Sequence, residues 1–463
     1  MPCAQHFTGS PATESPCTKP SVPRHASADE RLATPHRPVS CRPSHCDFVH
    51  LPHPPINTRS FVTPRKARYF HLVMIALVVA TTSWAQCFAS KVVMQGLDNP
   101  RGLAFDAAGA LYVTEAGRAE IPAPGTPSIT VRGAAIYHGT TGAISKWDGH
   151  TQSEVLTGLP SFYNSVNGDV AGPQGIGFSS SGALYFTTGF GANPALRVGP
   201  EFNQLGLLMR VPTGSSTPQV PADVAAYEGT QNSAGGPVDS NPYQLQVHGG
   251  GVLVADAGAN AVLDVKFDGT IDLVRTLSAL PAGAEAVPTS LTLGTTGEIY
   301  VSQLMGFPFA VGGASVFRVD NAGLTSVGTG FTNVVDLATG PDGMLYVLEL
   351  AHRGLLSGDP TGGLWRLNPE TGVSTLLMTD GLIFPTALAF ADDGTLYIAN
   401  RGIIPGAGEV VSFQSVPEPA VTGAAAALGL IGLVWWRRRA ARRPNESAQF
   451  DLIEDRSAVR NVR

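Results

Sequence analysis

The chain has few cysteines, and none where a folded domain would use them. All five lie within the first 87 of its 463 residues, so the remaining 376 contain none. A disulfide framework, a Cys-x-x-Cys redox pair and a thiolate metal site are therefore excluded from residue 88 onward. Charged residues make up only 14% of the chain, whereas it contains 53 glycines and 36 prolines. That balance is typical of an all-β protein with many turns.

Basic residues are scarce in the middle of the chain. Between Lys91 and Ser415, 13 Lys and Arg stand against 27 Asp and Glu, which gives a net charge of −14. A domain this acidic repels phosphate backbones, so no nucleic acid is expected as a partner. Histidines are also few in this stretch, and no two have the spacing of metal ligands. They are His138, His150, His248 and His352.

The N-terminal end predicts two processing segments. Residues 1–64 are rich in Pro, His, Ser and Arg without a hydrophobic period, which is typical of a disordered leader; they also fit a stretch upstream of the true translation start. Cys41 and Cys46 with nearby histidines allow a metal cluster as the alternative. Residues 65–89 have the basic start, short apolar run and small-residue cleavage sites of a signal peptide. Cleavage is expected after Ala85 or after Ala89.

The C-terminal end combines a short motif, an apolar run and a basic cluster. Pro417-Glu418-Pro419 leads into a predicted transmembrane helix at 419–436, which an arginine cluster follows. This order, over 416–443, resembles the PEP-CTERM sorting signal. The resemblance implies recognition by an exosortase, cleavage near the triplet, and release or attachment at the cell surface. A plain single-pass anchor is the alternative, and residues 444–463 are expected as a cytoplasmic tail.

Between these ends one pattern recurs six times: a turn, an apolar strand, a glycine turn, and a strand with an aromatic residue. The copies stand 73, 68, 47, 46 and 51 residues apart. A fixed period near 45–50 residues with four short strands per unit predicts a β-propeller. A seventh, degenerate blade in the long second unit is the alternative to six. The copies are aligned on Leu111, Leu184, Val252, Ile299, Leu345 and Leu396.

The last copy lacks an outer strand, and the start of the mature chain can supply it. The segment that begins at Lys91 precedes Asn99-Pro100 as a fourth strand precedes the next blade elsewhere. Closing the ring this way removes two sheet edges. We therefore expect an all-β, six-bladed β-propeller over 90–415, closed by its N-terminal strand, and flanked by the signal peptide and one C-terminal transmembrane helix.

The repeats resemble the NHL and gluconolactonase-like group of six-bladed propellers. More closely, Asp239-Ser240-Asn241-Pro242-Tyr243 and the later Val254-Ala255-Asp256-Ala257-Gly258 resemble the ScyD/ScyE family. That family takes its name from the gene cluster for scytonemin, an indolic-phenolic sunscreen pigment, and its members are exported. The resemblance implies a fold more firmly than a function.

One polar position recurs in every copy, at the end of the second strand. Four of its members offer oxygen ligands of the kind Ca²⁺ prefers, and gluconolactonase-like propellers hold a metal with such residues near the channel mouth. The alternative is that this position binds backbone amides at the turn, once per blade. The proposed metal ligands are Glu115, Asp256, Glu349 and Asn400. The remaining two members, Thr188 and Gln303, are expected to contact a ligand.

Further candidates lie on the same face, where the first strands begin and the long loops emerge. Arg101, Gln174 and Tyr243 are expected to contact a ligand, and His352 is the acid-base candidate. Loop aromatics fit either a ligand pocket or anchors for the loops. They are Phe162, Tyr163, Phe190, Phe202, Phe307 and Phe309.

Two functions from different classes fit these features. The first is an exported binding or scaffold propeller at the cell envelope or in exported polymer. Its partners would be signal peptidase, exosortase, the membrane, and a small aromatic ligand or extracellular polysaccharide. The second is an exported enzyme on an aromatic or lactone-like molecule, with Ca²⁺ or another divalent cation as cofactor.

Overall fold

The structure is a computed structural model that describes residues 88–277 and 284–415. The predicted leader, most of the predicted signal peptide, the sorting signal and the tail lie outside these residues. In the described part, no helix has the length and apolar character needed to span a bilayer.

The described strands form six sheets, which we number as blades 1 to 6 in chain order. Blade 1 is the largest and blades 2 to 5 have four strands each. Blade 1 contains β2 (Pro100–Phe105), β3 (Leu111–Glu115), β4 (Ser128–Val131), β5 (Ala134–Trp147), β6 (Gln152–Tyr163) and β7 (Val170–Ala171). Blade 2 contains β8 (Pro173–Phe178), β9 (Leu184–Thr188), β10 (Leu207–Val211) and β11 (Gln219–Asp223).

Blades 3 to 5 repeat one simple pattern, in which each strand pairs antiparallel with the next. Blade 3 contains β12 (Pro242–His248), β13 (Gly251–Asp256), β14 (Ala261–Lys266) and β15 (Ile271–Thr276). Blade 4 contains β16 (Pro288–Leu293), β17 (Ile299–Gln303), β18 (Ala314–Asp320) and β19 (Gly323–Phe331). Blade 5 contains β20 (Val334–Thr339), β21 (Leu345–Glu349), β22 (Gly363–Leu367) and β23 (Ser374–Met378).

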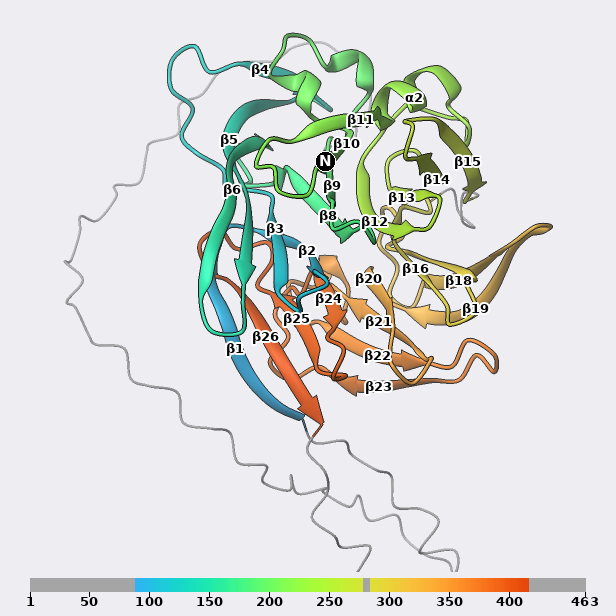
Figure 1. Ribbon diagram of the computed structural model, residues 1–463. Helices are drawn as coiled ribbons and strands as arrows, with labels where there is room; N and C mark the ends of the chain where they lie inside the picture. The colour runs from blue at the N-terminus through green and yellow to red at the C-terminus, as the bar shows by residue number, and fades with distance from the viewer. Residues whose placement is uncertain (1–87, 278–283, 416–463) are drawn as a thin grey trace, which may run out of the picture. The chain divides into compact units, whose positions relative to one another are not determined.

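Blade 6 joins the two ends of the domain. Its order is β1-β26-β25-β24, so the strand that begins the described chain forms its outer edge. The pairing of β1 with β26 runs from Phe88 opposite Ser415 to Leu97 opposite Gly408, and the two strands lie side by side in Figure 1. The strands are β1 (Phe88–Leu97), β24 (Ala387–Phe390), β25 (Leu396–Asn400) and β26 (Gly408–Ser415).

The six first strands contact one another in a closed cycle, β2-β8-β12-β16-β20-β24 and back to β2. This arrangement is an all-β propeller-like fold (Figure 1). Burial in blade 3 is greatest in the second strand: every residue of β13 is buried, whereas the outer strand β15 is only partly covered. The second strand is covered by neighbouring blades on both sides, which is why the sequence of β13 is nearly a continuous apolar run.

Neighbouring blades are joined by repeated contacts. The last residue of a first strand packs edge-to-face on the second-strand tyrosine of the preceding blade, as Phe178 does on Tyr112 at 4.9 Å and Phe390 on Tyr346 at 4.7 Å between ring centroids. Hydroxyl groups add hydrogen bonds across two other boundaries, between blades 2 and 3 and between blades 6 and 1. Thr187 donates to the carbonyl oxygen of Tyr243, and Thr386 to that of Pro100, both at 2.7 Å.

Close approach of the inner strands requires a residue without a side chain at one position. A Cβ atom on Gly102 would lie 2.4 Å from the carbonyl oxygen of Gln174 in the next blade. Glycine is therefore needed there for packing, in addition to its use in the hairpin turns.

Two segments depart from the predicted long loops. The first lies between β3 and β6, where β4 and the first part of β5 form a hairpin whose turn residues Arg132 and Gly133 have φ of 48° and 83°. The second contains α2 (Val224–Gln231), a helix that we did not predict. Short 3₁₀ turns lie in two further loops: η1 (Pro194–Leu196), η2 (Phe202–Gln204) and η4 (Leu355–Ser357).

Candidate functional site

The recurring polar position lies where the sequence places it, at the last residue of each second strand. We call these six residues the strand-end set, and all of them are buried. They are Glu115, Thr188, Asp256, Gln303, Glu349 and Asn400, which end β3, β9, β13, β17, β21 and β25.

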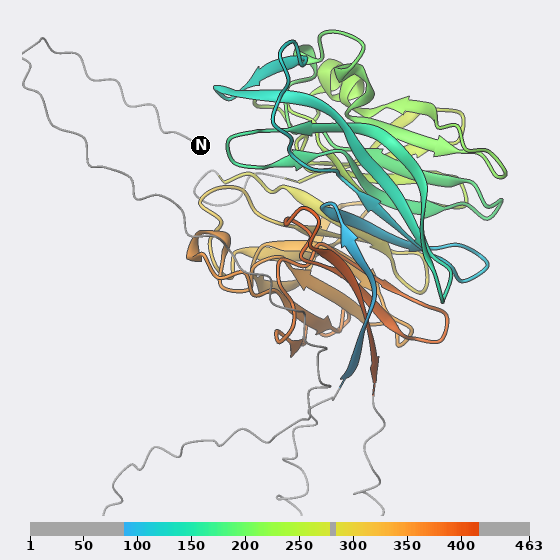
Figure 2. The same cartoon turned by 90° about the vertical axis from the view of Figure 1, so that its left-hand side faces the viewer.

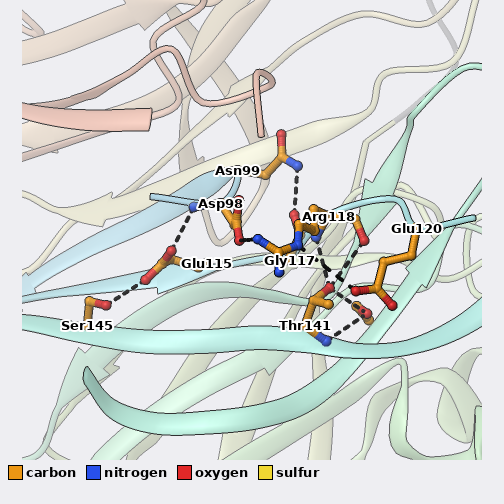
Figure 3. Close-up of polar contacts among 9 residues, drawn as sticks. Asp98, Asn99, Glu115, Gly117, Arg118, Glu120, Thr141 and Ser145 are labelled. Atoms are coloured by element: carbon orange, nitrogen blue, oxygen red, sulfur yellow. Dashed lines mark hydrogen bonds and ion pairs between the residues drawn. The ribbon is translucent and has the colours of Figure 1, made fainter. Parts of the chain in front are cut away.

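Glu115 is bound within its own blade (Figure 3). Its Oε2 accepts a hydrogen bond from the backbone N–H of Asp98 at 2.7 Å, and its Oε1 accepts one from the Ser145 hydroxyl at 2.5 Å. Burial raises the pKa of this carboxyl, although the two hydrogen bonds oppose that shift. The side chain thus fixes the segment that enters β2 to the end of β3.

Asp256 has the same role with more donors. Its Oδ1 accepts from the backbone N–H groups of Asn241 at 2.6 Å and of Gly258 and Ala259 at 3.1 Å each. Its Oδ2 accepts from the Ser240 hydroxyl at 2.7 Å. Burial raises its pKa to about 6 against the effect of these bonds. The segments 239–243 and 254–258 therefore meet through this one carboxylate.

Glu349 and Asn400 complete the pattern. Oε1 of Glu349 accepts from the backbone N–H of Thr332 at 2.7 Å, and Oδ1 of Asn400 accepts from that of Ile383 at 2.7 Å. In four blades, then, the strand-end side chain binds the backbone amide just before the first strand. These contacts support the structural interpretation of this position, in which its side chain binds backbone amides at the turn.

The strand-end set does not fit a shared Ca²⁺ site. In residues 88–277 and 284–415, no group of three or more His, Cys, Asp or Glu side chains could hold a metal ion. The oxygen atoms expected as ligands bind N–H and O–H donors of their own blades instead. The recurrence that suggested a ligand set arises because each blade repeats the same turn.

The two remaining members of the set are Thr188 and Gln303. The Thr188 hydroxyl donates to the carbonyl oxygen of Gln204 at 3.0 Å and accepts from the N–H of Leu207 at 3.1 Å. Gln303 is 1% exposed, and its Nε2 has no acceptor among the described residues.

Arg101, Gln174 and Tyr243 lie at the second position of their first strands. Arg101 donates to the carbonyl oxygens of Gly402 at 3.1 Å and Val170 at 3.3 Å. Gln174 donates from Nε2 to Oδ1 of Asn241 at 3.3 Å. Burial raises the pKa of the Tyr243 hydroxyl, and the nearby Arg101 guanidinium lowers it. Arg101 and Tyr243 occupy the same position in the first strands of blades 1 and 3.

A central cavity of about 370 Å³ lies inside the cycle of first strands. All six first strands contribute to its wall, five of them from their third to sixth positions and β24 from its second to fourth, so it occupies the half of the channel away from Arg101 and Tyr243. This half adjoins the first hairpin turns, opposite the face that the loop lengths indicated. Its polar lining side chains are Gln244, Gln246, Ser290, Thr292, Asp336 and Thr339.

Asp336 is the one carboxylate in that lining. Its Oδ1 accepts from the Ser290 hydroxyl at 2.6 Å, and its Oδ2 accepts from the backbone N–H of Leu388 at 2.8 Å, so it joins blades 4, 5 and 6. Burial raises its pKa to about 6. The sequence contains a signal for the cavity: polar residues alternate with apolar ones within the first strands, as in Gln244-Leu245-Gln246.

His352 is held by the strand-end residue of blade 5. Its Nδ1 lies 2.5 Å from Oε2 of Glu349, which is fully buried, while the His352 side chain is 28% exposed. A Cβ atom on Gly363 would lie 2.5 Å from that same Oε2 and 3.0 Å from Nδ1. Glycine at 363 therefore leaves the space that the pair occupies. A carboxylate that orients a partly exposed imidazole is suited to general acid-base chemistry.

The loop aromatics mostly serve as anchors. Phe162, Phe190 and Phe202 are buried together in one apolar cluster beneath the long loops of blades 1 and 2. Tyr163 is also buried. Phe307 differs, with 56% of its surface exposed beside Phe309. The anchoring interpretation therefore holds for four of the six aromatic residues.

Comparison with known proteins finds similarity only among solved structures, because no protein-family profile and no curated protein matches the sequence. Regucalcin from Agrobacterium tumefaciens, described as a calcium-binding protein, is 11% identical over 72% of this chain and 97% of its own, with a TM-score of 0.43. A gluconolactonase from Xanthomonas campestris is 11% identical over 71% and 92%, with a TM-score of 0.43. Virginiamycin B lyase from Staphylococcus aureus is 14% identical over 71% and 100%, with a TM-score of 0.40. Similarity at this level concerns the fold alone.

Proposed function

We propose that this chain is an exported, exosortase-sorted propeller of the ScyD/ScyE type that binds a ligand at the cell envelope without transforming it. The observation that carries the proposal is the engagement of the strand-end set. Its charged members are already bound to backbone amides, so they are not free to form a reactive or metal-binding ring. What remains for a ligand is the central cavity, with its amide and hydroxyl lining.

The chemistry of that cavity indicates the class of ligand. Its volume falls at the lower end of the range for small-molecule sites. Asp336 has three hydrogen-bond donors, and the other polar groups in the wall are uncharged. Such a lining suits a small neutral molecule with hydroxyl groups, such as the end of an exported polysaccharide. A small phenolic ligand is the second probe for the same cavity.

Binding can be tested with a variant that fills the cavity. Ala104 lines it, and Ala104→Leu would remove space. Ala107→Leu makes the same change at an exposed position in the adjoining turn and serves as the control. Thermal-shift screening with oligosaccharides and phenols should give a stabilising ligand for the wild type and the control. Equal stabilisation of Ala104→Leu would refute the cavity as the binding site.

Export and sorting have a separate test. Replacing Pro417, Glu418 and Pro419 by alanine should leave the full-length protein in the membrane fraction, whereas the wild type is shortened and released to the surface. If both chains fractionate alike and keep the same mass, the segment is a plain anchor.

A second function is favoured by one specific contact, that between His352 and Glu349. With Nδ1 bound to the carboxylate, Nε2 is left to accept a proton from a water molecule as its oxygen attacks the carbonyl carbon of a lactone or aryl ester. The bond to the ring or aryl oxygen then breaks, and that oxygen takes the proton back from Nε2. A panel of such substrates should show turnover that His352→Gln abolishes and that the exposed control His150→Gln retains. No turnover by the wild type would leave binding as the function.

A further inference from the structure

The polar side chains of the central cavity all come from one half of the ring of blades. Six lining residues have polar side chains, and each lies on β12, β16 or β20, which are consecutive inner strands (Figure 1). The lining residues from blades 6, 1 and 2 are glycine or apolar, as Leu103, Ile176 and Leu388 are. The hydrogen-bonding side chains of the wall are therefore gathered opposite an apolar half.

Five of these six polar side chains are already bound by the protein. Asp336 accepts three hydrogen bonds, one of them from the Ser290 hydroxyl. The hydroxyl of Thr339 and Nε2 of Gln246 donate to backbone carbonyl oxygens at 2.8 Å and 3.0 Å. Oγ1 of Thr292 accepts from the N–H of Thr339 at 3.3 Å.

Gln244 is the exception. It is only 7% exposed, yet its amide makes no hydrogen bond with any residue that the structure describes. The shielded polar atoms that lack a partner belong to other residues, so the Gln244 amide is open to the cavity that it lines. Buried polar groups nearly always have a hydrogen-bond partner. An unpartnered amide at this place therefore points to a partner from outside the chain.

Gln244 lies at the deep end of the cavity, away from the first hairpin turns. It is the third residue of β12, as Ser290 is of β16 and Asp336 of β20, so the three form one polar layer. A Cβ atom on Gly175 in blade 2 would lie 2.8 Å from the Cα atom of Gln244, so glycine there allows blade 2 to pack directly against this residue. The carboxylate of Asp336 in the same layer disfavours an anionic ligand.

A glutamine amide presents N–H donors and an acceptor oxygen side by side. Two hydroxyl groups on adjacent carbon atoms match it, because one can donate to the oxygen while the other accepts from the N–H. We propose that Gln244 binds a vicinal diol of the ligand in the central cavity, with the carbon atoms of the ligand against the apolar half. Sugars and catechols share this chemistry. The inference rests on the proposed function, because it takes the central cavity as the binding site.

Isomeric diols test the proposal by titration calorimetry. Catechol and resorcinol differ only in the position of one hydroxyl, as do cyclohexane-1,2-diol and cyclohexane-1,4-diol. In at least one pair, the 1,2-isomer should bind the wild type about tenfold more tightly than its matched isomer. Gln244→Leu should remove this preference, whereas Gln231→Leu, at the exposed end of α2, should keep it.

The two pairs also distinguish the sources of the diol. A preference within the aromatic pair alone indicates a phenolic ligand, and one within the cyclohexane pair alone indicates a sugar. Either result supports the role of Gln244. Equal affinities within both pairs, no binding of any of the four diols, or a preference that Gln244→Leu keeps would overturn it.

Melting temperatures without ligand separate binding from a structural role. Gln244→Leu should melt no lower than the wild type, because it removes a polar group that has no partner on the protein. A variant that melts several degrees lower would show that the amide supports the fold, and would overturn the proposal. The proposed function is judged apart from this: a ligand that Ala104→Leu loses and Gln244→Leu keeps would leave the cavity as the binding site without a role for Gln244.

Discussion

Phe88 pairs with Ser415, so the first and last residues of the described domain lie opposite each other on β1 and β26. Figure 2 shows the two strands ending together at the edge of the propeller. Because β1 supplies the outer strand of blade 6, the two ends of the described domain hold the cycle of blades closed. Unfolding of β1 would expose the edge of β26 and the apolar residues beneath it.

The start of β1 bears on the position of signal cleavage. Phe88 and Ala89 pair with the end of β26, and Phe88 packs on the apolar cluster of blades 5 and 6. A chain that begins at Gln86, after the first predicted cleavage site, retains these contacts, whereas one that begins at Ser90 loses them. We expect the shorter chain to melt about 2 °C lower. Equal melting temperatures by calorimetry would mean that these two pairs contribute nothing.

The closure itself can be tested within β1. Leu97 is 1% exposed, so Leu97→Ala should lower the free energy of unfolding by about 3 kcal/mol. Val92 lies on the same strand but is 47% exposed, so Val92→Ala should change the free energy of unfolding by less than about 0.5 kcal/mol. Urea denaturation of both variants measures the difference. Similar small effects would show that β1 is only loosely attached.

Stability should depend on pH through Asp336. Its pKa is raised from 3.8 to about 6, so the folded state binds more protons than the unfolded state between these values. The contribution of Asp336 to stability is therefore largest below pH 4, falls as pH rises to 6, and is constant above. Its total change is about 3 kcal/mol.

Urea denaturation of the wild type and Asp336→Asn at several pH values isolates this contribution. The wild type should lose stability relative to the variant between pH 4 and 6. Asp320 is a control of opposite sign, because the Arg318 guanidinium lowers its pKa. For this second pair, the free energy of unfolding of the wild type should rise relative to that of Asp320→Asn as the pH rises through 4. If the stability difference between wild type and variant changed with pH in the same direction for both residues, the raised pKa of Asp336 would be contradicted.

What the sequence predicted well depends on local repetition. The turn glycines, the short strands and the polar residue that ends each second strand recur along the chain. Each repeat therefore supports the same prediction of local structure. The closing strand was predictable because the last repeat lacks a partner for Gly408–Ser415, and the segment at Lys91 matches it.

What it missed depends on contacts between distant residues or on weak local signals. The β4–β5 hairpin turns at Arg132-Gly133, which lacks the Asn-Gly or Asp-Gly signal of such turns. Helix α2 is only eight residues long, with Glu228 on its buried face. The pairing of His352 with Glu349 needs the space left by Gly363, which lies eleven positions further along the chain.

The central claim is that the charged side chains of the strand-end set bind backbone amides and not Ca²⁺. Calcium titration of the wild type and Asp256→Ala tests this claim most directly. We predict that Ca²⁺ leaves the melting temperature of the wild type unchanged. Without any metal, Asp256→Ala should lose about 3 kcal/mol, because three backbone N–H groups lose their acceptor. A stoichiometric Ca²⁺ ion that stabilises the wild type, with Asp256→Ala as stable as the wild type in its absence, would contradict the account.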